Sequence, residues 1–201
     1  MKNRDQRYKG NMMLVSCTAS KNRQQPMVKL FIAATLDGYI ARKDGSIDWL
    51  EELPNPSGND HGYNHFYNSI QGLIMGRQTY EDVAAFDMPW PYAGKPTYVF
   101  SRSKMAPFST PDTSQGGSVS RAWLSSLPEK VRSGLWLVGG GELIGAFLQE
   151  KLVDEITLCL FPRLLGEGRP LFKGVYPECV LRRKAVEPFD SGLVNITYDI
   201  I

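Results

Sequence analysis

The chain has 201 residues and a formal net charge of +2, which leaves no bulk electrostatic case for nucleic-acid binding. A chain of this length can bury one good hydrophobic core, so we expect one main domain. Its three cysteines are too few and too widely spaced for a disulfide framework, and they fit a reducing, cytoplasmic compartment. No apolar run approaches the roughly 20 residues that a membrane span needs.

Residues 1–26 differ from the rest of the chain because they are polar and basic. Leu14-Val15-Ser16-Cys17 resembles a bacterial lipoprotein cleavage box. The apolar segment there is shorter than the about 7 to 15 residues of a secretory signal, which counts against export. We therefore expect residues 1–26 to be a disordered extension, which would be translated if an upstream start codon were used in place of the true one. The folded domain is expected to cover residues 27–201.

The first expected strand covers residues 28–34, an apolar run that only Lys29 interrupts. Asp37-Gly38 marks a turn, and residues 39–41 resume extended structure. Trp49 follows in a polar loop beside an aspartate. Two interpretations of Trp49 stay open, a surface anchor and a lid over a pocket.

A helix is expected around residues 63–70, with Asn59 or Asp60 as its cap. His61 and His65 lie four residues apart at its start, a spacing that suits a metal ion. No third ligand is evident nearby in the sequence, so we expect solvated or stacked histidines and no metal site.

A buried strand at residues 72–76 is followed at once by a helix. Gly76, Arg77 and Thr79 then stand at the helix N-terminus, where charge, a hydroxyl and the helix dipole can hold phosphate. The alternative is an ordinary capped helix with an exposed arginine.

A third short strand is expected at residues 97–100, and Ser101-Arg102-Ser103 follows it. Hydroxyls and a cation then lie at the carboxyl end of a strand, where open α/β sheets bind ligands. We expect a loop over residues 104–117, a strand at Val119 and a short helix over residues 121–127.

Three consecutive glycines, Gly139 to Gly141, join an apolar strand to a helical pattern. Glycine removes the Cβ that would block a phosphate, and the free N–H groups of the helix N-terminus can bind it. The alternative is a tight turn without a ligand. The Rossmann fingerprint is absent, because Ile144 replaces its third glycine and the next strand ends without a carboxylate.

The C-terminal third begins with an expected strand at residues 154–161 and a turn at residues 162–168. Residues 181–187 and 193–200 alternate strongly around a turn at residues 190–192, which predicts an antiparallel hairpin. The whole order of elements predicts an α/β fold, with a mostly parallel central sheet and an antiparallel C-terminal hairpin.

In this order the segments resemble the dihydrofolate reductase superfamily. They look more like its branch related to the C-terminal reductase domain of the bifunctional riboflavin biosynthesis enzyme (RibD). The resemblance covers about residues 27–200 and implies the three-layer fold of that superfamily. It rests on Thr35-Leu-Asp-Gly-Tyr-Ile-Ala41, Ile74-Met-Gly-Arg-Gln-Thr-Tyr-Glu81, Val99-Phe-Ser101, Trp136-Leu-Val-Gly-Gly-Gly-Glu142, Leu152-Val-Asp-Glu-Ile156, Pro162 and Leu165-Gly-Glu-Gly168.

The resemblance implies an NADPH-dependent reductase that transfers a hydride to a pteridine- or pyrimidine-like small molecule. In the family, the Gly-Arg-x-Thr turn and the serine at the next strand end bind the adenosine side, and the triple glycine holds the pyrophosphate. Two arginines near the adenosine end favour NADPH over NADH, because a 2′-phosphate needs cationic partners. The matching positions are Gly76, Arg77, Thr79, Ser101, Arg102, Gly139, Gly140, Gly141, Glu142 and Leu143.

The chain departs from true folate reductases at the substrate end. Glu142 stands where they usually have arginine, and Lys95 follows Gly94 where they have an arginine for the glutamate tail of folate. These departures count against dihydrofolate as the physiological substrate. They leave 5-amino-6-(5-phosphoribosylamino)uracil, the pyrimidine of the riboflavin enzyme, as the alternative.

Weaker signals suggest the rest of the site. Asp37 is the candidate polar contact to substrate and Asp60 the candidate acid, while Thr35, Trp49 and Phe66 are expected as pocket walls. For each, a structural role stays open: a turn, a helix cap or the core. The rival function is a non-catalytic dinucleotide-binding or sensing protein on the same fold. Homodimers are common among relatives, so a homodimer also stays open.

Overall fold

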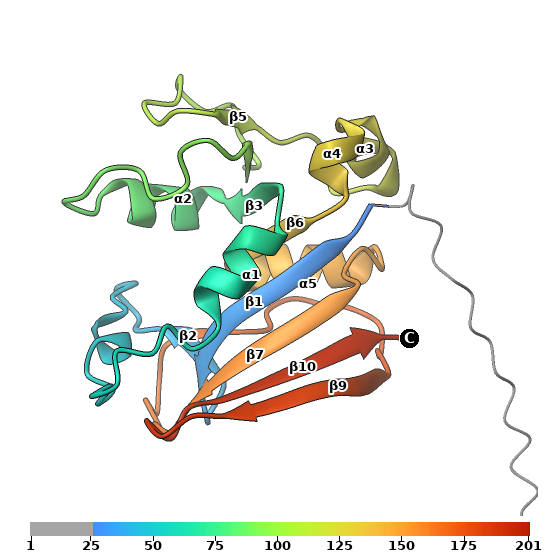
Figure 1. The fold of residues 1–201 in the computed structure, drawn as a ribbon. Coiled ribbons are helices and arrows are strands. Elements are labelled where there is room, and N and C mark those ends of the chain that lie inside the picture. The colour runs from blue at the N-terminus through green and yellow to red at the C-terminus, as the bar shows by residue number, and fades with distance from the viewer. Residues whose placement is uncertain (1–25) are drawn as a thin grey trace, which may run out of the picture.

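The computed structural model describes residues 26–201, and Figure 1 shows their arrangement. The predictions for residues 1–25 lie outside this part of the chain. The strands are β1 (Val28–Thr35), β2 (Tyr39–Ala41), β3 (Gly72–Gly76), β4 (Thr97–Phe100), β5 (Thr113–Gln115), β6 (Leu135–Gly139), β7 (Glu155–Phe161), β8 (Arg169–Pro170), β9 (Leu181–Pro188) and β10 (Val194–Ile200). The helices are η1 (Asp48–Leu50), α1 (Tyr63–Ser69), α2 (Arg77–Ala84), α3 (Arg121–Ser126), α4 (Glu129–Arg132) and α5 (Gly141–Gln149).

The central sheet has eight strands in the order β5-β4-β3-β6-β1-β7-β10-β9. Every pair from β5 across to β7 is parallel, whereas β10 runs antiparallel to both β7 and β9. The predicted α/β fold, with a mostly parallel sheet and an antiparallel C-terminal hairpin, is therefore confirmed. Strands β2 and β8 form a separate antiparallel pair.

Helices cover both faces of the sheet, which gives three layers (Figure 1). On one face, α5 and the α3–α4 segment pack Phe147, Leu124 and Val131 against the sheet. On the other face, α1 and α2 place Phe66 and Tyr80 over β3 and β6. The central strands are apolar on both sides because both sides are buried, as parallel sheets require.

Trp49 belongs to the core. It is fully buried, and its ring meets Phe161 edge to face with centroids 4.9 Å apart. Cys159 and Leu193 complete this small cluster at the end of β7. Both interpretations of Trp49, as a surface anchor and as a lid, are therefore wrong: its large apolar ring, carried by the 3-10 helix η1, is buried against Cys159 and Phe161 of β7 and against Leu193.

Two strands differ from the expected elements. The fifth strand is β5 and not Val119, which lies in the following loop. Strand β5 has the sequence Thr-Ser-Gln and lies at the edge of the sheet, next to β4. Because all three of its residues are polar, the alternation of apolar and polar residues that predicts a strand is missing. The two-residue strand β8 lies inside the segment that follows the expected turn, and it is too short to leave a periodic signal.

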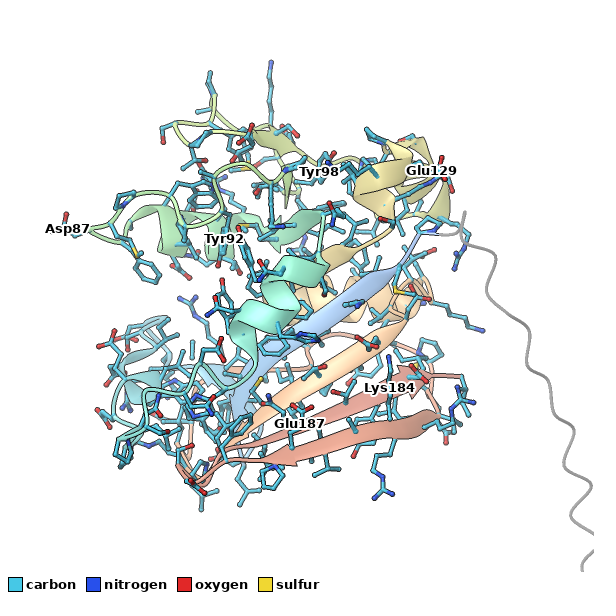
Figure 2. All side chains as sticks on the ribbon, viewed as in Figure 1. Asp87, Tyr92, Tyr98, Glu129, Lys184 and Glu187 are labelled. Atoms are coloured by element: carbon cyan, nitrogen blue, oxygen red, sulfur yellow. The ribbon has the colours of Figure 1, made fainter. Side chains whose placement is uncertain are left out.

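The other edge of the sheet is β9, whose residues are largely exposed on both faces. Half of the residues of β9 are charged, and Figure 2 shows Lys184 and Glu187 on this strand. Lys184 pairs with Glu155, and Arg182 lies 3.2 Å from Asp199. Such charges discourage edge-to-edge aggregation. Among residues 26–201, the helices are all too short or too polar to cross a bilayer.

Candidate functional site

A cleft of about 1320 Å³ opens at the carboxyl ends of β3, β4 and β6. These three strands are neighbours in the sheet and parallel, so their last residues meet at one edge. Helix α2 starts directly after β3, and α5 starts after β6. All ten residues predicted to bind the cofactor line this cleft: Gly76, Arg77, Thr79, Ser101, Arg102, Gly139, Gly140, Gly141, Glu142 and Leu143.

The glycines let three segments of backbone approach one another. A Cβ on Gly76 would lie 3.6 Å from the carbonyl oxygen of Gly139 and 3.8 Å from the nitrogen of Gly140, so the two turns touch. A Cβ on Gly141 would lie only 2.4 Å from the carbonyl oxygen of Pro170 in β8. Gly139 has φ +136°, a conformation that side chains rarely adopt. The sequence therefore needs glycine here for packing as well as for any ligand.

Both helix N-termini at the cleft lack a side-chain cap. The N-cap residue is Gly76 for α2 and Gly140 for α5, and neither has a side chain that could accept from the first-turn N–H groups. Those N–H groups and the positive ends of both helix dipoles face the cleft region, where they favour an anion.

The arginines of the predicted adenosine side connect the three strand ends. Nε of Arg77 donates to Glu81 at 2.7 Å, and its Nη1 donates to Oγ of Ser103 at 3.4 Å. Nη2 of Arg102 donates to Glu142 at 3.1 Å, which joins the end of β4 to the first turn of α5. These groups are well exposed, so each pair contributes little to stability and can exchange partners.

Glu142 has a second cationic partner, Lys173, whose Nζ lies 2.6 Å from it. The hydrogen bond and charge of Lys173, together with the charge of Arg102, lower the pKa of Glu142. The carboxylate is therefore ionised at neutral pH. Glu142 sits where folate reductases have arginine, and here it lies between two cations that can also bind phosphate.

Arg169 links two walls of the cleft. Its Nη1 donates to Asp82 on α2 at 2.8 Å, and its Nη2 donates to the backbone oxygen of Asp44 at 3.1 Å. Gly45 packs directly against the guanidinium, and a Cβ there would lie 2.4 Å from Nη2. The loop after β2 is thereby tied to α2 across the cleft.

The far end of the cleft is aromatic. Phe31, Tyr63, Tyr92 and Trp136 line it, each from a different part of the chain. Trp136 meets Tyr63 and Tyr92 edge to face, with centroids 6.0 Å and 5.7 Å apart, and its Nε1 donates to the oxygen of Phe31 at 3.0 Å. Tyr92 lies in the loop after α2, and its ring is near Tyr67 of helix α1 (Figure 2). Flat faces and edges of this kind suit a planar heterocycle.

Asp37 is absent from the cleft lining. Its carboxylate accepts hydrogen bonds from the Thr35 hydroxyl at 2.5 Å and from the N–H groups of Gly166 at 2.7 Å and Leu165 at 3.2 Å. These bonds, that of Thr35 first, lower the pKa of Asp37. The carboxylate holds the loop after β7 in place, and a direct contact to substrate stays a prediction that this geometry does not support.

Asp60 also lies away from the cleft. Its carboxylate accepts from the N–H groups of Asn64 and Gly62, each at 3.0 Å, and these bonds lower its pKa. Asp60 is exposed and orders the first turn of α1, where a negative charge also suits the helix dipole. Its role as the acid remains a prediction without support from the geometry.

The expected pocket walls lie behind the cleft lining. Phe66 is buried and stacks on Phe31, which does line the cleft, with centroids 4.4 Å apart. Thr35, the last residue of β1, is buried and its hydroxyl accepts from the N–H of Tyr39, and Trp49 lies in the core described above. Lys95 donates to the oxygen of Ile70 at 2.7 Å and so serves the fold. His61 contacts Ser191, and residues 26–201 contain no cluster of three or more potential metal ligands.

Sequence reasoning missed the side chains that form the aromatic end and the Arg169 link. They come from segments far apart in the chain and carry no motif. The one weak signal in the sequence is the high density of tyrosine and tryptophan in residues 63–67 and 90–92, which is compatible with an aromatic pocket wall. No spacing rule would have paired Asp82 with Arg169.

Known proteins show the same fold and related sequences. The chain is 39% identical over 170 residues to the uncharacterized protein YwjB of Bacillus subtilis, covering 82% of this chain and 92% of YwjB. A crystal structure of a presumed riboflavin biosynthesis protein from Shewanella sp. PV-4 superposes with a TM-score of 0.77 at 36% identity, over 87% of this chain and 99% of that one.

More distant structures share the fold alone. One is a deaminase and 5-amino-6-(5-phosphoribosylamino)uracil reductase of Thermotoga maritima, with TM-score 0.66, 19% identity, and coverage of 89% of this chain and 58% of that one. Another is the dihydrofolate reductase of Enterococcus faecalis in complex with NADP(H), with TM-score 0.62, 18% identity, and coverage of 88% and 97%. The model of the RibD C-terminal domain matches residues 26–195, and the chain belongs to that family.

Proposed function

We propose that this protein is an NADPH-dependent reductase that transfers a hydride to a pyrimidine-like heterocycle. The observation that carries the proposal is the meeting of three phosphate-compatible turns at one cleft, at the ends of β3, β4 and β6. A dinucleotide spans several such points, whereas a single phosphate needs one. The family and its reductase neighbours support the same class of reaction.

The cofactor would lie with its pyrophosphate on the glycine turn between β6 and α5. The uncapped N-termini of α2 and α5 supply N–H donors there. Arg77, Arg102 and Ser101 would hold the adenosine end, and a 2′-phosphate would gain two guanidinium partners. This arrangement favours NADPH over NADH.

The nicotinamide would supply the hydride, and the protein would supply position. The aromatic end of the cleft adjoins the glycine turn, because Trp136 and Gly139 lie three residues apart on β6, a distance of roughly 10 Å along a strand. A planar substrate between these rings would be held next to a nicotinamide whose pyrophosphate is on the turn. Holding two reactants in this way is the main source of rate in such a reaction.

The first test is a titration of the full-length protein with NADPH and with NADH, followed by nicotinamide fluorescence. We expect NADPH to bind the more tightly. The variant Arg77→Ala should weaken NADPH binding about tenfold or more, and NADH binding much less. Lys104→Ala is the matched control, because Lys104 lies nearby in the sequence but does not line the cleft. Absence of binding by either dinucleotide would overturn the proposal.

One observation favours the rival function, a non-catalytic dinucleotide-binding or sensing protein. The two carboxylates expected to act in catalysis, Asp37 and Asp60, lie outside the cleft. A protein that binds NADPH tightly but reduces neither 5-amino-6-(5-phosphoribosylamino)uracil nor dihydrofolate would match this rival.

A further inference from the structure

Reduction of a C=N or C=O bond needs a proton as well as a hydride, and the carboxylates of the cleft are already paired. Among the residues that line it, three carry a carboxyl group. Glu81 accepts from Arg77, and Asp82 accepts from Arg169 and Gln78. Glu142 lies between Lys173 and Arg102. All three carboxylates are thus already engaged by cations, and the pKa of Glu142 is lowered by the hydrogen bond and charge of Lys173.

Two phenols remain at the aromatic end. Tyr63 of α1 and Tyr92 of the loop after α2 both line the cleft. Within the described part of the chain, neither hydroxyl has a hydrogen-bond partner. The other residues around Trp136 that line this end, among them Phe31, Ile32 and Val138, carry no proton that could be transferred.

Tyr63 is the better placed of the two. Its ring stacks on Tyr67, with centroids 5.7 Å apart and planes 15° apart, and meets Trp136 nearly edge to face. These contacts fix the direction of its hydroxyl. Tyr63 also keeps partial exposure, whereas Tyr92 is 8% exposed and surrounded by Trp90, Tyr67 and Trp136. A donor must regain its proton from solvent in every cycle, which Tyr63 can do more readily.

We propose that Tyr63 is the catalytic acid of this site, donating its phenolic proton to the substrate as the nicotinamide delivers the hydride. The proposal rests on the reductase function given above. The substrate class follows from it: a neutral, planar heterocycle with a ring-attached C=N or C=O group, bound between aromatic rings and a phenol. Each carboxylate that lines the cleft is already paired with a cation, so none is offered to a cationic ring.

The step balances with the reduced cofactor as the only reductant. Bound NADPH would supply the hydride: the C4–H bond of its dihydronicotinamide would break, and a C–H bond would form at the electrophilic carbon. The electron pair of the C=N or C=O bond moves to nitrogen or oxygen, which takes the proton of Tyr63. The cofactor leaves oxidised, and water returns a proton to the phenolate. A developing alkoxide or nitrogen anion is a much stronger base than a phenolate, so the transfer is downhill.

The surroundings of Tyr63 set the expected pH dependence. Burial, and then the neighbouring Tyr67, raise the pKa of Tyr63. The titratable groups that face the cluster are Tyr67 on the same helix, Tyr92 from the opposite loop, and Lys95, whose ammonium lies 4.8 Å from the centre of the Tyr67 ring. Tyr63 therefore stays protonated through neutral pH. The hydride-transfer rate should be flat there and fall only where the phenol ionises, above about pH 10.

The test uses Tyr63→Phe, which removes one oxygen and keeps the ring contacts. Single-turnover oxidation of bound NADPH would be followed with 5-amino-6-(5-phosphoribosylamino)uracil and with dihydrofolate. We expect the rate to fall about 100-fold or more, while the Kd for NADPH stays within about twofold. Tyr67→Phe is the matched control, because Tyr67 is one turn away and does not line the cleft; its rate should be unchanged.

The outcomes separate the two proposals. If Tyr63→Phe turns over at the wild-type rate, the role of Tyr63 is wrong while the reductase function stands. If the wild-type rate falls as pH rises from 5 to 8, a carboxylic acid donates the proton and the role of Tyr63 is again wrong. If the wild-type protein binds no NADPH, the reductase function fails and the role of Tyr63 fails with it.

Discussion

The two ends of the cleft are built in different ways. One end, the proposed phosphate end, is made of backbone: glycine turns, helix N-termini and short segments at three neighbouring strand ends. The aromatic end is made of side chains that converge from β1, α1, the loop after α2 and β6. Backbone sites of this kind recognise what ligands share, such as a pyrophosphate, whereas side-chain sites decide which substrate fits. The difference predicts that mutations at the two ends separate cofactor binding from turnover.

The largest effect is expected for Gly141→Ala. Its Cβ would lie 2.4 Å from the oxygen of Pro170 and 3.0 Å from that of Leu171, so the backbone of β8 must move. We expect a loss of about 3 kcal/mol in the free energy of unfolding, measured by denaturant titration.

Gly76→Ala is the matched variant for this comparison. A Cβ at Gly76 meets its neighbours at ordinary distances of 3.6 Å or more, so stability should change little. The added methyl group would narrow the approach to the glycine turn, and we expect NADPH binding to weaken about tenfold. Equal destabilisation by the two variants would contradict the prediction that packing requires glycine at position 141 but not at position 76.

An intermediate effect is expected for Trp136→Phe at the aromatic end. The variant keeps a ring but loses the hydrogen bond to the oxygen of Phe31, at a cost of about 1–2 kcal/mol in stability. Tyr63 and Tyr92 then contact a smaller ring in place of the indole that they share. We expect turnover to fall about tenfold while the Kd for NADPH stays within about twofold.

Trp123→Phe is the control for that variant, because Trp123 packs against Tyr98 and Phe100 and does not line the cleft. It should lower stability without changing turnover. A large loss of NADPH affinity in Trp136→Phe would contradict the division of the cleft into two ends.

The smallest effect is expected for Asp37→Asn and appears only in acid. The hydrogen bonds to Thr35, Gly166 and Leu165 hold the folded-state pKa of Asp37 below its ordinary value, so the ionised carboxylate stabilises the fold above that ordinary value. This stabilisation is lost as pH falls through the lower, folded-state pKa. Thermal unfolding between pH 2 and pH 5 should therefore show a shallower acid decline in the variant. We expect the Asp37→Asn variant to bind NADPH with wild-type affinity. A complete loss of turnover in this variant would support Asp37 as a contact to substrate.

How much of the molecule could be predicted from sequence follows the same division. The turns at Gly76 and Gly139 could be predicted because each is marked by glycine or arginine residues adjacent in the sequence. The parallel topology then brings the two turns together. Tyr63 and Tyr92 could not be placed, because their meeting depends on how α1 and the loop after α2 pack on β6. The role of Asp60 could not be decided from sequence for a physical reason: the same carboxylate that suits an acid also suits a helix N-terminus.

In the cleft, carboxylates of the protein compete with any bound anion for the same cationic side chains. Each cation that lines it, such as Arg102 or Lys173, is paired with a carboxylate of the same chain, which acts as a tethered ligand at high effective concentration. A buffer anion with a single charge gains little by displacing Glu142. A molecule that carries several phosphates replaces several carboxylates in one binding event. We therefore expect the cleft to favour polyanions over ions with a single charge, before any contact with a base or a ring is made.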